Sequence, residues 1–200
     1  MRTRAKKTHS SPKKAMGSFR IIGGEWRSRR LSFPGIESLR PTTDRVKETV
    51  FNWLSGEIEG AKVLDLFAGS GSLGLEALSR GAASLTLIER DRLAAQAIRD
   101  NLSLLKCQAE VIQSDAIAWL KQSITERTRS PYSLIFLDPP FRQGLLDSCL
   151  ELLENSAILE SNTLVYLELE QERRDLLIPS GWQLLKEKSA GQVSYRLYKT

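Results

Sequence analysis

The sequence contains very few of the residues that most often carry catalysis or bind metals. One histidine, His9, stands in a polar N-terminal stretch, and the two cysteines, Cys107 and Cys149, lack the spacing of metal ligands. We therefore expect any catalysis to proceed without histidine, and we expect no metal site. Two cysteines without disulfide-like spacing are typical of a reducing compartment, so we expect a cytoplasmic protein.

Long hydrophobic runs are also missing. No run approaches the roughly 18 apolar residues of a membrane span, and no apolar segment of a secretory signal follows the N-terminus. We expect no membrane partner. The 200 residues are 41% hydrophobic, which is enough for one core with a small appendage.

Acidic residues are scarce at the front of the chain. Residues 1–47 contain 13 Lys and Arg against 3 Asp and Glu, a net charge of +10, whereas the remainder carries 16 against 21, a net charge of −5. A basic N-terminal segment followed by a mildly acidic remainder of the chain indicates a polyanionic partner such as nucleic acid. For residues 1–18, which lack an apolar pattern, an RNA anchor and a solvated disordered tail are equally compatible with the sequence.

The rest of the chain divides into two parts. In residues 19–56, a short β-hairpin is predicted around Gly23 and Gly24, followed by a helix capped by Thr42 or Thr43. In residues 57–200, strands are expected at 63–67, 84–88, 109–113, 133–137, 163–169, 182–188 and 193–199, with helices at 71–80, 91–105, 115–126 and 143–155. This alternation predicts an α/β, Rossmann-like fold. Its seven-stranded sheet is mostly parallel, has helices on both faces and ends in an antiparallel strand pair.

A glycine-rich turn follows the first of these strands. Gly69, Gly71 and Gly74 have the G-x-G-x-x-G spacing between strand and helix, and Glu89 ends the second strand. Such a turn lets a ligand approach the backbone, and the acid can accept hydrogen bonds from ribose hydroxyls. These features alone fit a dinucleotide as well as S-adenosylmethionine.

Two further acids favour the second ligand. Asp65 lies within the first strand, where a carboxylate would repel a pyrophosphate and attract an ammonium group. Asp115 follows the third strand and can receive an adenine amino group, although simple capping of the next helix explains it equally well. For Asp65 the alternative is an acid satisfied by backbone donors.

The fourth strand ends in Asp138-Pro139-Pro140-Phe141, which is expected beside the first strand and next to the reactive end of the ligand. The Asp138 carboxylate and the Pro139 carbonyl can each accept one N–H bond from a planar exocyclic amine and so fix it for attack. The prolines make the turn rigid and remove backbone donors, and Phe141 can stack on a base. An acid and a turn that merely end a strand are the alternative explanation.

These motifs, together with the segments RIIGGEWRSRRL and LRPTTDRVKETVFNWL, resemble the RsmD family of class I S-adenosylmethionine-dependent methyltransferases over about residues 19–200. The resemblance implies methylation of the N2 amine of one guanine of 16S ribosomal RNA, guanine 966 for the family. It implies catalytic roles for Asp138, Pro139, Pro140 and Phe141, and RNA contacts from Arg20, Arg27, Arg29 and Arg30. It assigns to the cofactor site Arg40, Pro41, Thr42, Arg45, Asp65, Phe67, Ala68, Gly69, Ser70, Gly71, Glu89, Arg90, Asp115 and Ala116.

The expected partner is 16S ribosomal RNA within the assembled or assembling small subunit, because one small domain has little surface to specify a single guanine in naked RNA. A monomer is expected. Three alternatives stay open: an adenine-N6 DNA methyltransferase, a non-catalytic RNA-binding protein on the same scaffold, and a nicotinamide-dependent oxidoreductase supported by the glycine turn alone.

Overall fold

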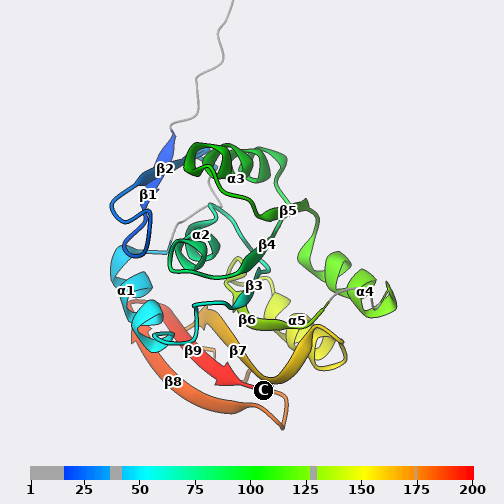
Figure 1. Cartoon of the computed structure of the whole chain (residues 1–200). Coiled ribbons are helices and arrows are strands. Elements are labelled where there is room, and N and C mark those ends of the chain that lie inside the picture. The colour runs from blue at the N-terminus through cyan, green and yellow to red at the C-terminus, as the bar shows by residue number, and fades with distance from the viewer. Residues whose placement is uncertain (1–15, 37–41, 127–129, 174) are drawn as a thin grey trace, which may run out of the picture.

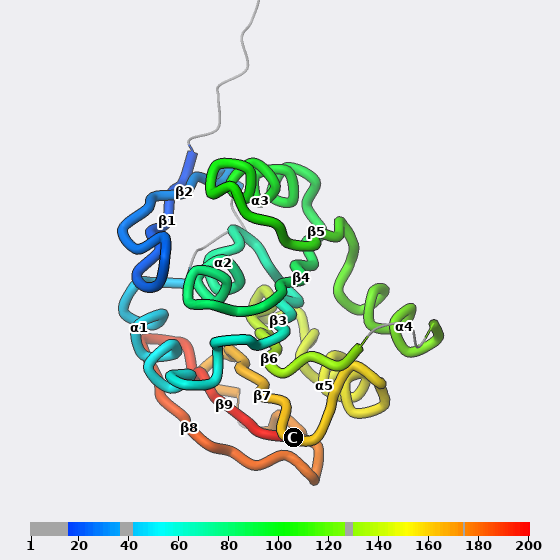
Figure 2. The backbone as a smooth tube through the Cα atoms, viewed as in Figure 1, coloured from blue at the N-terminus to red at the C-terminus, as the bar shows by residue number. Residues whose placement is uncertain are grey.

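The structure, a computed structural model, describes residues 16–36, 42–126, 130–173 and 175–200. A twisted central sheet has helices on both faces, and a small hairpin lies outside the sheet beside α2 and α3 (Figures 1 and 2). The predicted fold class is confirmed, including the mostly parallel sheet and its antiparallel end.

The sheet has the strand order β5-β4-β3-β6-β7-β9-β8. The first five of these strands run parallel, whereas β9 pairs antiparallel with both β7 and β8. The strand bounds are β3 Lys62–Asp65, β4 Ser84–Glu89, β5 Glu110–Gln113, β6 Tyr132–Leu137, β7 Leu159–Glu170, β8 Gln183–Ala190 and β9 Val193–Lys199. Because the chain order reverses between β3 and β6, the carboxyl ends of these two strands form the crevice in which such folds bind ligands. Strand β7 begins four residues earlier than expected. Its carboxyl end lies beside the carboxyl end of β6, because the two strands pair in parallel.

The helices are α1 Asp44–Trp53, α2 Ser72–Ser79, α3 Arg92–Leu105, α4 Ala116–Glu126 and α5 Leu145–Glu154. One core lies between the sheet and the layer formed by α1, α2, α3 and the hairpin, and a second core lies between the sheet and α4 and α5. Alternating residues of each strand enter opposite cores: Val63 and Phe136 face the first, and Leu64 and Ile135 face the second.

The N-terminal hairpin consists of β1 Gly17–Arg20 and β2 Arg30–Phe33. Helix α1 begins after Thr43, whose hydroxyl accepts a hydrogen bond from the backbone N–H of Val46. The apolar stripe of this helix is buried in the first core together with Phe19 and Phe33 of the hairpin, and it consists of Val46, Val50, Phe51 and Leu54. Hairpin and α1 therefore fold as part of the main core.

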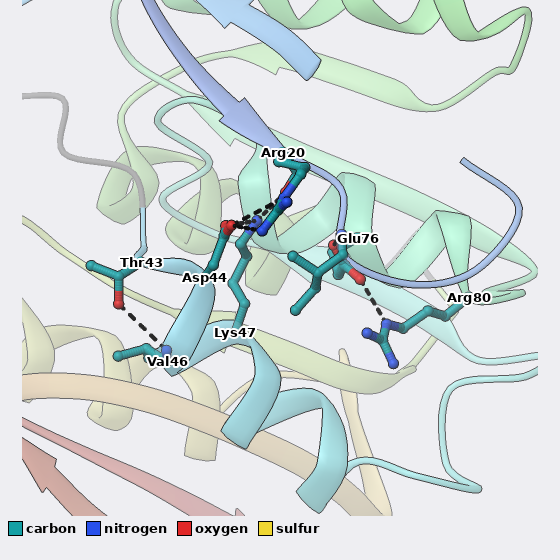
Figure 3. A network of polar contacts seen from close by, with 8 residues as sticks. Arg20, Thr43, Asp44, Val46, Lys47, Glu76 and Arg80 are labelled. Atoms are coloured by element: carbon teal, nitrogen blue, oxygen red, sulfur yellow. Dashed lines mark hydrogen bonds and ion pairs between the residues drawn. The ribbon is translucent and has the colours of Figure 1, made fainter. Parts of the chain in front are cut away.

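Buried charges fix the hairpin in place (Figure 3). Lys47 of α1 has no exposed side-chain surface, donates to the backbone carbonyl of Arg20 and lies 3.4 Å from the Asp44 carboxylate. Glu76 of α2 accepts from the backbone N–H of Ile22 at 2.8 Å and from the Arg80 guanidinium at 2.7 Å. The hairpin is thus joined by charge-assisted hydrogen bonds to two helices that flank the crevice.

Candidate active site

The glycine turn is held to the second strand of the sheet by Glu89. One carboxylate oxygen of Glu89 accepts from the backbone N–H of Gly69 at 2.8 Å, and the other accepts from the N–H of Asp91 at 2.6 Å. Gly71 adopts φ 79°, a left-handed conformation that favours glycine, and it forms the N-cap of α2 without a side-chain cap. The backbone donors at the start of α2 therefore lie at the turn, and Glu89 retains lone pairs for a ribose.

Asp65 lies beneath this turn at the end of β3 and is almost fully buried. Its carboxylate accepts a hydrogen bond from the backbone N–H of Gly74 at 3.1 Å. This contact supports part of the alternative explanation, in which backbone donors satisfy the acid. Burial, reinforced by the charge of Glu89, nevertheless raises the pKa of Asp65 to about 7. A group of positive charge placed beside Asp65 would relieve this cost. Gly74 allows the close approach, because a Cβ at this position would lie 3.1 Å from the Asp65 carboxylate.

Three carboxylates follow one another along the crevice on neighbouring strands. The register pairs Asp65 with Phe136 of β6, and Leu137 of β6 with Leu167 of β7. Asp65, Asp138 and Glu168 share the strand alternation of residues that face the first core, so they line the same side of the sheet. Burial raises the pKa of Asp138, and the nearby charges of Glu168 and then Asp65 raise it further.

The Asp138-Pro139-Pro140-Phe141 turn leaves the sheet at the carboxyl end of β6, as predicted. Asp138 is half-buried, Pro139 is buried, and the Phe141 side chain is 40% exposed, which leaves a ring face available for stacking. The turn forms one wall of a small hollow that is open to solvent, and the other walls come from the start of α5 and the end of β7. The backbone N–H of Arg142 donates to Glu170 of β7, which fixes the turn beside that strand.

The remaining cofactor-site predictions lie around the glycine turn. Phe67 is half-buried and Ala68 and Ser70 are buried, whereas Arg90 is exposed beyond Glu89. Asp115 is exposed at the end of β5 and caps α4 by accepting from the backbone N–H of Ala118 at 3.0 Å. Ala116, which begins α4, is buried. Capping occupies one oxygen of Asp115, so the adenine contact stays a prediction beside it.

Four residues of the N-terminal part were predicted to contact the cofactor, and the structure describes two of them. Thr42 and Arg45 lie at the start of α1, where Arg45 is exposed. Arg40 and Pro41 lie outside the described residues. The roles of these four residues in the cofactor site stay predictions.

The hairpin arginines lie apart from the glycine turn. The loop between β1 and β2 packs on the far end of α2, where the backbone N–H of Trp26 donates to the Ser79 hydroxyl at 3.0 Å. Ser79 lies about 10 Å along α2 from its first residue, and Arg27, Arg29 and Arg30 of this hairpin are exposed. Arg20 is paired with Asp44 at 2.8 Å. Their predicted RNA contacts would therefore extend the footprint of a polyanion well beyond the crevice.

The sequence reasoning missed Glu168 and Lys47. Both side chains are buried and charged, and Glu168 lines the hollow beside the Asp138 turn. The signal for Glu168 was the pattern TLVYLELE, in which an acid occupies an inward position of a buried strand. Lys47 stands among the buried positions of α1 and gave a similar signal.

The electrostatics of the crevice decide between the ligand classes. Carboxylates of four strands, β3, β4, β6 and β7, gather at its edge, and the pKa values of all four are raised. A pyrophosphate would be repelled by this arrangement, whereas a cationic sulfonium and ammonium would be attracted. The residues present therefore fit S-adenosylmethionine better than a dinucleotide. Within the described ranges, no helix is long and apolar enough to cross a membrane, and no cluster of three metal-ligating side chains is found.

Residues 19–199 match the family described as "Conserved hypothetical protein 95". The Escherichia coli (strain K12) protein named "Ribosomal RNA small subunit methyltransferase D" is 51% identical over 92% of this chain and 90% of its own length. The chain belongs to the RsmD family. The solved structure of yhhF from Escherichia coli, a proposed methyltransferase, has 50% identity and a TM-score of 0.82 over 92% of this chain and 98% of that chain.

A more distant solved structure shares the fold. It is described as the 16S rRNA N2 G1207 methyltransferase RsmC of Thermus thermophilus in complex with AdoMet and guanosine. It has 21% identity and a TM-score of 0.61, covering 92% of this chain and 49% of that chain. The fold predicted from the sequence agrees with this comparison.

Proposed function

We propose that this RsmD-family protein transfers a methyl group from S-adenosylmethionine to the N2 amine of one guanine of 16S ribosomal RNA. The observation that carries the proposal is the Asp138-Pro139-Pro140-Phe141 turn, which leaves β6 next to β3, the strand that ends in Asp65 and leads into the glycine turn. A cationic donor and a planar amine acceptor would then meet at one end of the crevice. The relatives named as small-subunit ribosomal RNA methyltransferases support the choice of RNA.

The cofactor, when bound, supplies an activated methyl group on a positively charged sulfur. Asp65 offers a buried negative charge for its amino group, and the N–H groups at the start of α2 offer hydrogen-bond donors for its carboxylate. Glu89 accepts from ribose hydroxyls while still holding the glycine turn. Asp115 takes the adenine amino group with the oxygen that does not cap α4.

At the acceptor end, Asp138 and the Pro139 carbonyl each accept one hydrogen bond from the N2 amine. This arrangement holds the amine lone pair toward the methyl carbon and raises its availability as the bond forms. Transfer of the methyl group from the cofactor's sulfur to N2 would leave an excess proton on the amine, which Asp138 would accept and pass to water. Phe141 stacks on the guanine ring, so the base must be unpaired or flipped out of its stack.

Recognition of the RNA extends to the hairpin. Arg27, Arg29 and Arg30 are exposed on a hairpin that Lys47 and Glu76 fix to α1 and α2, so these arginines would touch phosphates at a constant distance from the crevice. Such contacts position the RNA without reading its sequence. We therefore propose that the enzyme is a monomer and that its physical substrate is the assembled or assembling small subunit. Naked 16S RNA methylated as well as subunits would contradict this part.

The test is methyl transfer from labelled S-adenosylmethionine to small subunits from cells that lack the enzyme, followed by nucleoside mass analysis. We expect N2-methylguanosine at one site. Methyladenine, or transfer to DNA alone, would refute the guanine proposal. Cofactor binding without transfer to any nucleic acid would favour a binding protein on the same scaffold.

A further inference from the structure

Glu168 of β7 is a buried carboxylate in the wall of the proposed base pocket. It is 6% exposed and lines the hollow together with Pro139, Pro140 and Phe141. It lies on the same face of β7 as Tyr166, two residues earlier, whose hydroxyl donates to one Glu168 oxygen at 2.7 Å. The side chain is therefore held in one orientation at the pocket.

Burying an ionised Glu168 carboxylate in these surroundings costs free energy that a purely structural role does not explain. Its hydrogen bond from Tyr166 is outweighed by burial, which raises the pKa of Glu168 to about 7. In the described part of the chain, no Lys or Arg forms an ion pair with it, and Arg173 of the same hollow pairs with Asp147 instead. A glutamine or an apolar residue would fill the position at lower cost. A donor on a bound ligand would supply the missing partner.

The strand register brings Glu168 next to Asp138. Leu137 pairs with Leu167, so the next residue of each strand is also a neighbour across a strand spacing of about 4.8 Å. In agreement with this register, burial and then the charge of Glu168 raise the pKa of Asp138. Two acceptors side by side suit a ligand with two adjacent donors on one edge.

Guanine has such an edge, because its N1–H and its N2 amine are adjacent donors. Adenine offers an acceptor at N1, which would face a carboxylate unfavourably. With the N2 amine between Asp138 and the Pro139 carbonyl, the neighbouring N1–H points toward the β7 side of the pocket.

We propose that Glu168 is the residue that selects guanine, by accepting the hydrogen bond from N1–H, and that Tyr166 holds it in position. The inference rests on the proposed guanine-N2 activity. It assigns specificity to a strand that carries none of the motif residues. A site built to bond a donor rejects an analogue without it strongly, because the buried acceptor is then left unpaired.

The test compares two target bases that both carry an N2 amine. Small subunits are reconstituted with 16S RNA that has guanine or 2,6-diaminopurine at the position which the wild-type enzyme methylates. Diaminopurine has an unprotonated N1, so only guanine can donate to Glu168. We expect the wild-type enzyme to prefer guanine at least about 100-fold in kcat/KM.

The variant is Glu168→Gln, whose amide can still accept from Tyr166 and can also donate to the N1 of diaminopurine. We expect the guanine preference to fall at least about tenfold, with diaminopurine turnover rising in absolute terms. Tyr166→Phe should lower guanine turnover and relax the preference less. Glu160→Gln, which changes an exposed glutamate near the start of the same strand, is the control and should keep the preference of the wild type.

Two results would overturn the inference. One is an unchanged preference in Glu168→Gln; the other is an equal loss on both bases, which would indicate a general role in positioning or proton transfer. Melting temperature and S-adenosylhomocysteine affinity of each variant show that it is folded. A wild-type enzyme that methylates neither base would refute the proposed function itself, so the two failures are distinguishable.

Discussion

Asp65 makes cofactor affinity depend on pH in a direction that the structure fixes. Its pKa is raised from the ordinary value of 3.8 to about 7, mainly by burial. The carboxylate is therefore largely protonated at pH 6 and largely ionised at pH 7.5. Because the ionised form attracts the ammonium of S-adenosylmethionine, affinity should rise with pH across this interval.

The magnitude follows from the fraction of Asp65 that is ionised. With a pKa of about 7, this fraction is about 0.09 at pH 6 and about 0.76 at pH 7.5, which predicts a roughly eightfold tighter Kd at the higher pH. Glu89 and Asp138 also have raised pKa values and change in the same direction. The informative quantity is therefore the difference between the wild type and Asp65→Asn, measured by titration calorimetry with S-adenosylmethionine below pH 7.5.

Asp65→Asn should bind weakly and show a much flatter pH profile. The asparagine oxygen can still accept from the backbone N–H of Gly74, so the variant keeps the turn. Without ligand it should melt at a higher temperature than the wild type at pH 8, because it carries no buried charge. This advantage should shrink as the pH falls, since a raised pKa destabilises the folded state only above the ordinary value. A wild-type affinity that is constant or increases on acidification would refute the reasoning, as would an Asp65→Asn variant with an unchanged pH slope.

Three other changes test separate parts of the molecule. Asp138→Ala should nearly abolish methyl transfer while leaving S-adenosylhomocysteine affinity largely intact, and equal loss of both would mean that Asp138 mainly builds the pocket. Lys47→Ala leaves the Arg20 carbonyl and the Asp44 carboxylate without their buried partner, so chemical denaturation should show a loss of about 2 kcal/mol or more, with Glu48→Ala at an exposed position of the same helix as a control. An unchanged unfolding midpoint would show that the hairpin is held by apolar packing alone. Replacing Arg27, Arg29 and Arg30 together with glutamine should weaken RNA binding and reduce its salt slope by about 3, whereas an unchanged slope would place the RNA elsewhere.

Much of the fold was predictable because its signals are local. Apolar runs separated by amphipathic stretches gave every strand and helix of the main sheet, and the glycine spacing around Gly69 located the ligand turn. The least accurate boundary was the start of β7, where Leu159–Asn162 carry a mixed polar pattern and join the strand through neighbours that are distant in sequence.

The candidate site was predictable only in part. Asp65, Glu89 and Asp138 stand next to recognisable turns, so each could be found from its own segment. Glu168 has no motif around it, and its proximity to Asp138 depends on the pairing of strands that are 30 residues apart.

The sequence by itself determined the order of strands and helices, the glycine turn and the rigid acidic turn after β6, because glycine, proline and hydrophobic periodicity act on their own segment of chain. Tertiary structure alone decided which of these segments became neighbours. The crossover that places β6 beside β3, and β7 beside β6, aligns Asp65, Asp138 and Glu168. Burial raises the pKa of all three carboxyl groups, and the charges of Glu168 and Asp65 raise that of Asp138 further. The packing of the hairpin on α1 and α2 likewise buried Lys47 and fixed where the exposed arginines lie, because burial depends on what covers a residue and not on its own chemistry.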